Sequence, residues 1–198
     1  MAKFFGNLWL VLLVGFALAV LIAVFPDSGY SVAPGAHDGE GSKGIAMSVL
    51  QWLHVFFGII WIGLLYYFNF VQTPTMPAIP AELKPGVSKY IAPKALFYFR
   101  WGAAFTVLTG LLLAWAYGEL KEALTLDPSA RLIGIGMYLA LIMAFNVWVI
   151  IWPNQQKVLG LVAADDAAKA KAAATAGMAS RINTLLSIPM LLAMTNAH

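Results

Sequence analysis

Apolar runs long enough to cross a bilayer recur along this chain, and they constrain its fold more than any other feature. We place five such spans at about residues 8–25, 45–71, 95–117, 131–152 and 182–197. A transmembrane helix needs about 20 consecutive, mostly apolar residues, because backbone polar groups in hydrocarbon must be satisfied within the segment. The sequence therefore predicts an all-α integral membrane bundle of about five helices, with a single domain over residues 1–198.

Composition supports this class and excludes several kinds of site. The chain is 61% hydrophobic and only 11% charged, against about 25% charged residues in soluble domains. It has no cysteine, which excludes disulfides, iron–sulfur clusters, thiolate zinc sites and haem attached through a CxxCH motif. The net charge of +3 is small and the basic residues are spread among loops, so we expect the lipid bilayer as partner and no nucleic acid.

The segments between the spans have distinct compositions. Pro26 and Asp27 follow the first span in place of a small-residue cleavage pattern, which favours a signal anchor over a removed signal peptide. Residues 72–94 are interrupted by five prolines and are predicted to form a connector. We expect a short acidic loop after the third span, a fourth span that stops at Pro153, and an Ala-rich solvated or interfacial helix at 157–180.

The distribution of Lys and Arg predicts the orientation. Nine of these residues lie before span one or in the connectors and helix ends between spans two and three and between spans four and five. The other side of the bundle holds Lys43, Lys121 and Arg131. The positive-inside rule then places the N-terminus in the cytoplasm and the C-terminus outside.

His54 is the most informative candidate residue, because it lies within hydrocarbon, about 10 Å from the outer boundary of span two. A polar imidazole at that depth needs a partner. Gly58 and Trp61 share its helix face, and the glycine leaves a flat recess. Two interpretations stay open: a haem macrocycle uses the recess with His54 as axial ligand, or a neighbouring helix packs there and bonds the imidazole.

His198 is the candidate for a second axial ligand, since the predicted orientation puts it in the same half of the membrane as His54. Paired axial histidines would hold a low-spin, non-covalent haem b. The alternative is a mobile terminal histidine. His37, in the loop after span one, is expected to be solvated and is a weaker ligand candidate.

Polar residues also gather toward the inner side: Arg100, Asn146, Asn154, Arg181 and Asn183. The two arginines are either interfacial anchors or ligands for an anion such as a haem propionate or an acidic substrate. Asn146 is deeper and needs a partner on another helix. No Asp or Glu lies inside any span, which argues against a proton pump or a cation-coupled transporter.

Four stretches, Leu50–Pro74, Phe99–Ala103, Asn146–Gly160 and Ser180–Met194, resemble the urate oxidase N-terminal family, the membrane region of the cytochrome-linked bacterial urate hydroxylase. The resemblance covers the chain from about residue 47 onward. The second span is also similar, more weakly, to the bacterial membrane protoporphyrinogen oxidase.

The main resemblance implies a multi-pass protein of the bacterial inner membrane that oxidises urate or relays its electrons to a periplasmic c-type cytochrome. It carries over onto His54 and, as site-forming residues, onto Arg100, Asn146, Asn154, Arg181 and Asn183. The sequence has no c-type haem motif, so we expect the cytochrome or a larger membrane complex as partner. Two alternatives stay open: a non-catalytic membrane subunit or anchor of a redox complex, and an enzyme of haem synthesis resembling protoporphyrinogen oxidase.

Overall fold

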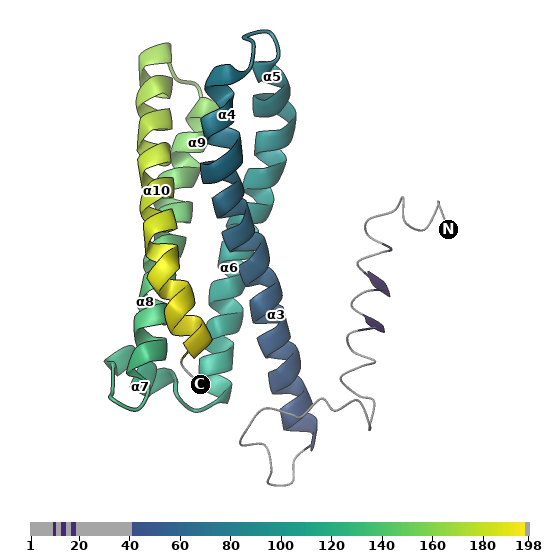
Figure 1. The fold of residues 1–198 in the computed structure, drawn as a ribbon, viewed down its shortest axis with the longest axis vertical. Coiled ribbons are helices and arrows are strands. Elements are labelled where there is room, and N and C mark those ends of the chain that lie inside the picture. Colours follow the sequence, from purple (N-terminus) through teal and green to yellow (C-terminus); the bar gives the residue numbers. More distant parts are fainter. Residues whose placement is uncertain (1–9, 11–12, 15–16, 19–40, 197–198) are drawn as a thin grey trace. The chain divides into compact units, whose positions relative to one another are not determined.

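The computed structural model describes residues 10, 13–14, 17–18 and 41–196. The expected span at 8–25 lies largely outside these residues, and His37 and His198 lie outside them entirely. The chain divides into two compact units, Met1–Trp52 and Leu53–His198, with the boundary inside helix α3 (Gly41–Tyr66). The second unit holds the candidate site and is helical throughout its regular structure in the described residues (Figure 1).

The helices follow one another with few breaks. After α3 come the π-helical turn η1 (Tyr67–Gln72), α4 (Thr73–Thr75), the 3₁₀ turn η2 (Met76–Ala78), α5 (Lys84–Gly86), the π-helical turn η3 (Val87–Ile91), α6 (Ala92–Ala116), α7 (Leu120–Thr125), α8 (Arg131–Phe145), the π-helical turn η4 (Asn146–Ile151), α9 (Trp152–Val158) and α10 (Asp166–Asn196). Several of these pieces join end to end, so they form a smaller number of long helices.

Three of the long helices in the described residues are long and apolar enough to cross a membrane: Ala46–Ala78, Lys84–Ala116 and Arg131–Val158. They contain almost all of the second and third expected spans and the whole of the fourth. Helix α10 contains the expected span at 182–197, up to Asn196. The all-helical architecture is therefore as predicted, with three helices that meet the requirement for a membrane span.

The expected connector at 72–94 is wrong in extent, because most of these residues are helical. The break in the helix covers only residues 79–83, and Ile79 has extended backbone angles (φ −75°, ψ 129°). Pro74, Pro77, Pro85 and Pro93 each stand in the first turn of a helical segment. Pro85 lies at the start of a long helix, where the first N–H groups have no partner within the helix. Pro74, Pro77 and Pro93 lie inside the long helices, and Pro74 and Pro93 closely follow the π-helical turns η1 and η3, where the regular hydrogen-bond pattern is already interrupted.

The expected end of the fourth span at Pro153 and the expected bounds of the helix at 157–180 are also wrong. Pro153 stands in the first turn of α9, which runs on to Val158. Helix α10 then extends without a break from Asp166 to Asn196 and joins most of the Ala-rich segment to the expected fifth span. Alanine is the strongest helix former, and Pro189 is accommodated inside the helix.

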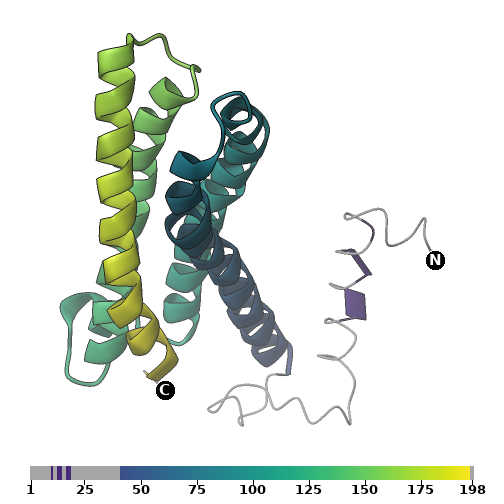
Figure 2. The same cartoon turned by 45° about the horizontal axis from the view of Figure 1, so that its top comes forward.

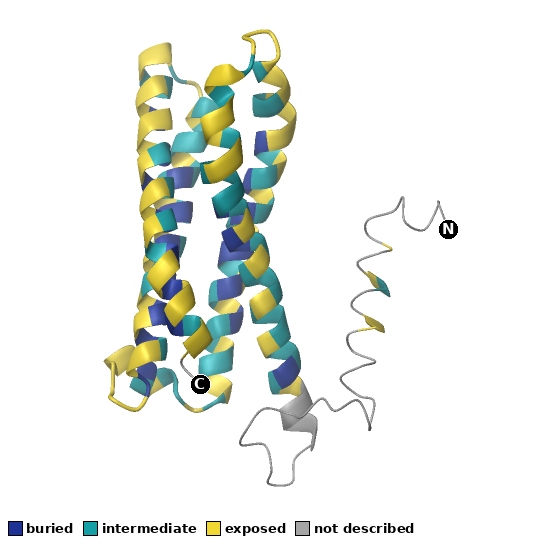
Figure 3. Ribbon diagram, viewed as in Figure 1, coloured by how far each residue is buried: buried dark blue, intermediate teal, exposed yellow. Residues whose placement is uncertain are grey.

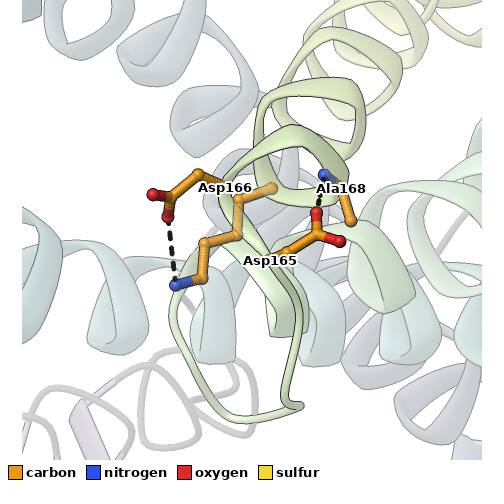
Figure 4. Close-up of polar contacts among 4 residues, drawn as sticks. Asp165, Asp166 and Ala168 are labelled. Atoms are coloured by element: carbon orange, nitrogen blue, oxygen red, sulfur yellow. Dashed lines mark hydrogen bonds and ion pairs between the residues drawn. The ribbon is translucent and has the colours of Figure 1, made fainter.

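The start of α10 is fixed by two aspartates (Figure 4). The Ala168 N–H donates to the Asp165 carboxylate at 2.7 Å, which satisfies a donor that has no partner within the helix. Lys169 lies 3.9 Å from the Asp166 carboxylate. Both acidic groups also complement the positive end of the helix dipole.

Helix α10 packs along α8, η4 and α9 (Figures 1 and 2). Its buried positions are mostly small: Ala172, Ala176, Ala179, Asn183, Ser187, Met190 and Ala193. Small side chains permit the close approach of helices in a membrane, where packing rather than the hydrophobic effect joins them. Buried residues accordingly line the facing sides of the helices, and exposed ones cover the outside (Figure 3).

The loop expected at 118–130 contains the short helix α7, which packs against α8. Asp127 caps the turn that follows: its carboxylate accepts hydrogen bonds from the Ser129 N–H at 3.0 Å and the Ser129 hydroxyl at 2.7 Å. These bonds, with a smaller contribution from Arg131, lower the pKa of the Asp127 carboxyl. The capped turn leads directly into α8, which begins at Arg131.

Candidate functional site

The imidazole of His54 bonds to helix α6, which supplies the partner that its depth demands. Its Nδ1 lies 2.9 Å from the Thr106 carbonyl oxygen and 3.3 Å from the Thr109 hydroxyl. A carbonyl can only accept a hydrogen bond, so Nδ1 carries the proton and donates it. In the neutral ring Nε2 is then the nitrogen with the free lone pair, and neither of these hydrogen bonds uses it.

The recess expected beside Gly58 is filled by protein. A Cβ atom at Gly58 would lie 3.9 Å from the Thr106 side chain, so α6 already packs at van der Waals distance. The glycine that makes room for the imidazole is on α6: a Cβ at Gly110 would lie 2.8 Å from His54 Cε1 and 3.1 Å from Nδ1.

One feature of this site fits a b-type haem and another does not. The imidazole fits the role of an axial ligand, because metal-bound histidines almost always donate their other N–H to a carbonyl or carboxylate. The face of Gly58 that meets Thr106 does not fit a macrocycle, because Thr106 occupies it. His198 lies outside the described residues, so the histidine pair is not placed. Within residues 41–196, no group of three or more His, Asp or Glu side chains could hold a metal ion.

Trp61 shares the α6-facing side of α3 with His54 and Gly58, as predicted. The helices come close here, since a Cβ at Gly102 would lie 3.2 Å from the Trp61 backbone nitrogen. The Trp61 side chain is fully buried in the core, and its indole Nε1 has no hydrogen-bond partner. Trp61 therefore packs in the bundle interior rather than lining an open recess.

Asn146 finds the interhelical partner that its depth predicts. Its amide group donates to the Asn183 side-chain oxygen at 2.8 Å, and the Asn183 amide donates to the Met143 carbonyl at 2.9 Å. Both asparagines are buried. Asn146 begins the π-helical turn η4, a type of irregularity that is frequent at functional sites. Asn154 is separate from this pair, and its amide donates to the Ile150 carbonyl of its own helix at 2.8 Å.

Arg100 rests on aromatic rings instead of an acidic partner. Its guanidinium carbon lies 3.1 Å from the centre of the Trp152 ring and 5.8 Å from that of Trp148. The Nε and Nη1 atoms of Arg100 are buried and have no hydrogen-bond partner. Arg181 is exposed on α10. The predicted inner-side residues thus divide into an Arg100–Trp152 contact and an Asn146–Asn183 pair.

Sequence reasoning missed the residues of α6 that hold His54. Thr106, Thr109 and Gly110 lie in an apolar span, and the two threonine side chains also bond to carbonyls of their own helix. A Thr-x-x-Thr-Gly pattern inside an apolar run is a usable signal, because it places hydroxyls and a gap on one side of the helix. A further polar contact between helices was also missed: the Tyr66 hydroxyl lies 2.9 Å from that of Ser187.

Comparison with known proteins gives one family match. No curated protein and no solved structure matches the chain. The match covers less than half of the chain; it includes Asn146, Asn154, Arg181 and Asn183, and it begins after His54, Gly58, Trp61 and Arg100. The resemblance predicted from the sequence is confirmed over this part: residues 123–198 match the family described as urate oxidase N-terminal.

Proposed function

We propose that this chain is a urate-hydroxylase-related redox protein of the bacterial inner membrane. It binds a b-type haem through His54 and passes electrons toward a periplasmic c-type cytochrome. The observation that carries the proposal is the family match over residues 123–198. The three long apolar helices support the membrane location.

The bonding of His54 supports its role as a haem ligand. The Thr106 carbonyl fixes the Nδ1–H tautomer and the ring orientation, which also raises the basicity of Nε2 as a ligand. His198 is the proposed second ligand. When bound, the haem supplies one-electron redox chemistry.

A series of aromatic rings supports electron transfer between the inner-side residues and His54. The Trp148 and Trp101 ring centres are 5.6 Å apart, and those of Trp101 and Phe105 are 5.8 Å apart. Phe105 stacks on Phe57 at 4.9 Å, and Phe57 lies three positions after His54 in α3. Closely spaced rings therefore connect the surroundings of Arg100 with those of His54.

The second candidate function is a non-catalytic subunit that anchors a partner redox complex. The packing around Gly58 favours it, because Thr106 occupies the recess. The Asn146–Asn183 pair also favours it, because these buried amides bond to each other and to the Met143 carbonyl. In this alternative the polar contacts fix the bundle and the chemistry belongs to the partner.

A visible spectrum of the purified full-length chain, oxidised and then reduced, tests the first proposal against the second. We expect a Soret band, and alpha and beta bands after reduction, in protein from haem-replete cells. His54→Ala should remove or strongly alter these bands, whereas Gly63→Ala, where nothing lies within 4 Å of the added Cβ, should leave them unchanged. A colourless wild-type preparation with normal helicity would contradict haem binding and favour the anchor.

Urate turnover is measured on the same preparations with an added electron acceptor. We expect the near-ultraviolet absorbance of urate to fall with the wild-type chain and to stay constant with His54→Ala. An equal rate of urate loss for both proteins would contradict the role assigned to His54.

A further inference from the structure

Arg100 is a cation that the bundle holds without neutralising it. The three helices that can cross a membrane contain no Asp or Glu. Among the described residues, Lys169 and Asp166 form an ion pair at the start of α10. Arg100 forms no ion pair with any described residue. Its Nε and Nη1 atoms are covered and unpaired. The guanidinium therefore brings a positive charge into the bundle with no carboxylate to balance it.

The aromatic contact does not replace a counter-charge. A cation–π contact attracts the guanidinium through the ring quadrupole, but it supplies no negative charge and accepts no strong hydrogen bond. The contact does hold the guanidinium in place, with its carbon 3.1 Å from the Trp152 ring centre. Arg100 and Trp152 are half-buried, and Nη2 is not among the covered, unpaired atoms, so it is the guanidinium nitrogen that a ligand can reach.

The surroundings favour a flat ligand over a compact one. The Trp148 ring centre lies 5.8 Å from the guanidinium carbon of Arg100. The Trp148 and Trp101 rings pack nearly edge to face, with an angle of 84° between their planes. Trp101 is 43% exposed. A planar anion gains both charge-assisted hydrogen bonds from Arg100 and contact with these rings. A tetrahedral phosphate also accepts charge-assisted hydrogen bonds from arginine, but it gains no stacking contact with the rings.

We propose that Arg100, held against Trp152, is the binding residue for a planar organic monoanion. This inference rests on the proposed function, under which the anion is the substrate itself, since urate is a planar monoanion at neutral pH. Trp152 is a positioning residue, which keeps the guanidinium oriented toward the ligand. The assignment divides the two arginines of the sequence prediction: Arg100 binds the anion, and the exposed Arg181 does not.

Binding of radiolabelled urate to the full-length chain in phosphatidylcholine nanodiscs tests the proposal. Arg100→Gln removes a charged hydrogen-bond donor, a loss of about 1.5–3 kcal/mol, and should raise the dissociation constant roughly tenfold or more. Arg100→Lys keeps the charge without the planar fork and should recover only part of the affinity. Trp152→Leu should weaken binding several-fold, and Arg181→Gln is the matched control that should leave it unchanged.

The visible spectrum and the melting temperature of each variant are recorded with the binding, so that loss of haem or of the fold is recognised. An unchanged dissociation constant for a folded Arg100→Gln would overturn the proposal. So would loss of bound phosphatidylglycerol in that variant with urate binding intact, because Arg100 would then be a lipid contact.

The same samples separate this inference from the proposed function. If the wild-type protein shows the haem bands and consumes urate, and Arg100→Gln has the same KM for urate, the proposed anion site is wrong but the proposed function stands. If the wild-type protein neither binds nor consumes urate, both the assignment of urate as substrate and the proposed anion site are wrong.

Discussion

Gly110→Ala tests whether His54 is held as the structure shows. The new Cβ would lie 2.8 Å from His54 Cε1, whereas ordinary contacts begin at 3.4 Å, so the ring must retreat by about 0.6 Å. The Nδ1 bond to the Thr106 carbonyl, now 2.9 Å, would lengthen to at most roughly 3.5 Å, which is beyond the range of a good hydrogen bond.

The energetic cost follows from this displacement. A lost hydrogen bond costs about 0.5–1.5 kcal/mol, and a buried polar group left unsatisfied costs about 1–3 kcal/mol. Replacing glycine by alanine inside a helix returns about 1 kcal/mol. The cost of the unsatisfied group includes the lost bond, so we expect Gly110→Ala to lower the free energy of unfolding by roughly 0–2 kcal/mol, and by roughly 1–3 kcal/mol relative to a Gly→Ala change that meets no neighbour.

Two measurements in detergent check this expectation. Unfolding followed by far-ultraviolet circular dichroism gives the stability, and nitrogen NMR of protein labelled at histidine reports the Nδ1 proton of His54. Gly63→Ala is the control, because nothing lies within 4 Å of a Cβ at that position. A Gly110→Ala variant as stable as the control, with an unchanged His54 resonance, would refute the geometry described for this site.

The other predictions concern the inner-side pair and the outer loop. Asn183→Leu should destabilise by about 1–3 kcal/mol, because the Asn146 amide then loses its buried partner. Asn146→Leu should cost less, because Asn183 keeps its bond to the Met143 carbonyl and only its side-chain oxygen loses a donor. The double variant should cost less than the two single costs combined, as a double-mutant cycle of thermal unfolding would measure. Gly134→Ala should destabilise the bundle, since its Cβ would overlap a backbone carbonyl of α7 that no side-chain rotation can move, and a melting temperature at or above that of wild type would contradict this. The hydrogen bonds from Ser129 lower the pKa of the Asp127 carboxyl, so in carbon NMR this group should titrate at a lower pH than ordinary aspartates. The stabilisation from these bonds is present above the unfolded-state pKa and is lost as pH falls through the lowered folded-state pKa. Ser129→Ala should move that midpoint upward, and an unmoved midpoint would exclude the hydrogen bonds as its cause.

Much of the helical architecture follows from the sequence alone. Apolar runs at 45–71, 95–117 and 131–152 predict helices because no other open structure satisfies its backbone in hydrocarbon, and each run lies almost entirely within a long apolar helix. The prolines misled the prediction of helix ends, because their effect depends on position. Pro85 stands at the start of a long helix, where a missing N–H costs nothing. Pro74 and Pro153 lie inside longer helices, which continue through them after the π-helical turns η1 and η4.

In the candidate site, the position of each polar residue along an apolar run shows that it needs a partner, whereas the packing of the helices selects that partner. Depth alone requires a partner for the imidazole of His54 and the amide of Asn146. The choice of Thr106 for one and Asn183 for the other depends on helix rotation and on glycines that let helices approach. Those are set by the packing of side chains from segments far apart in the sequence, so periodicity within one helix could not reveal them.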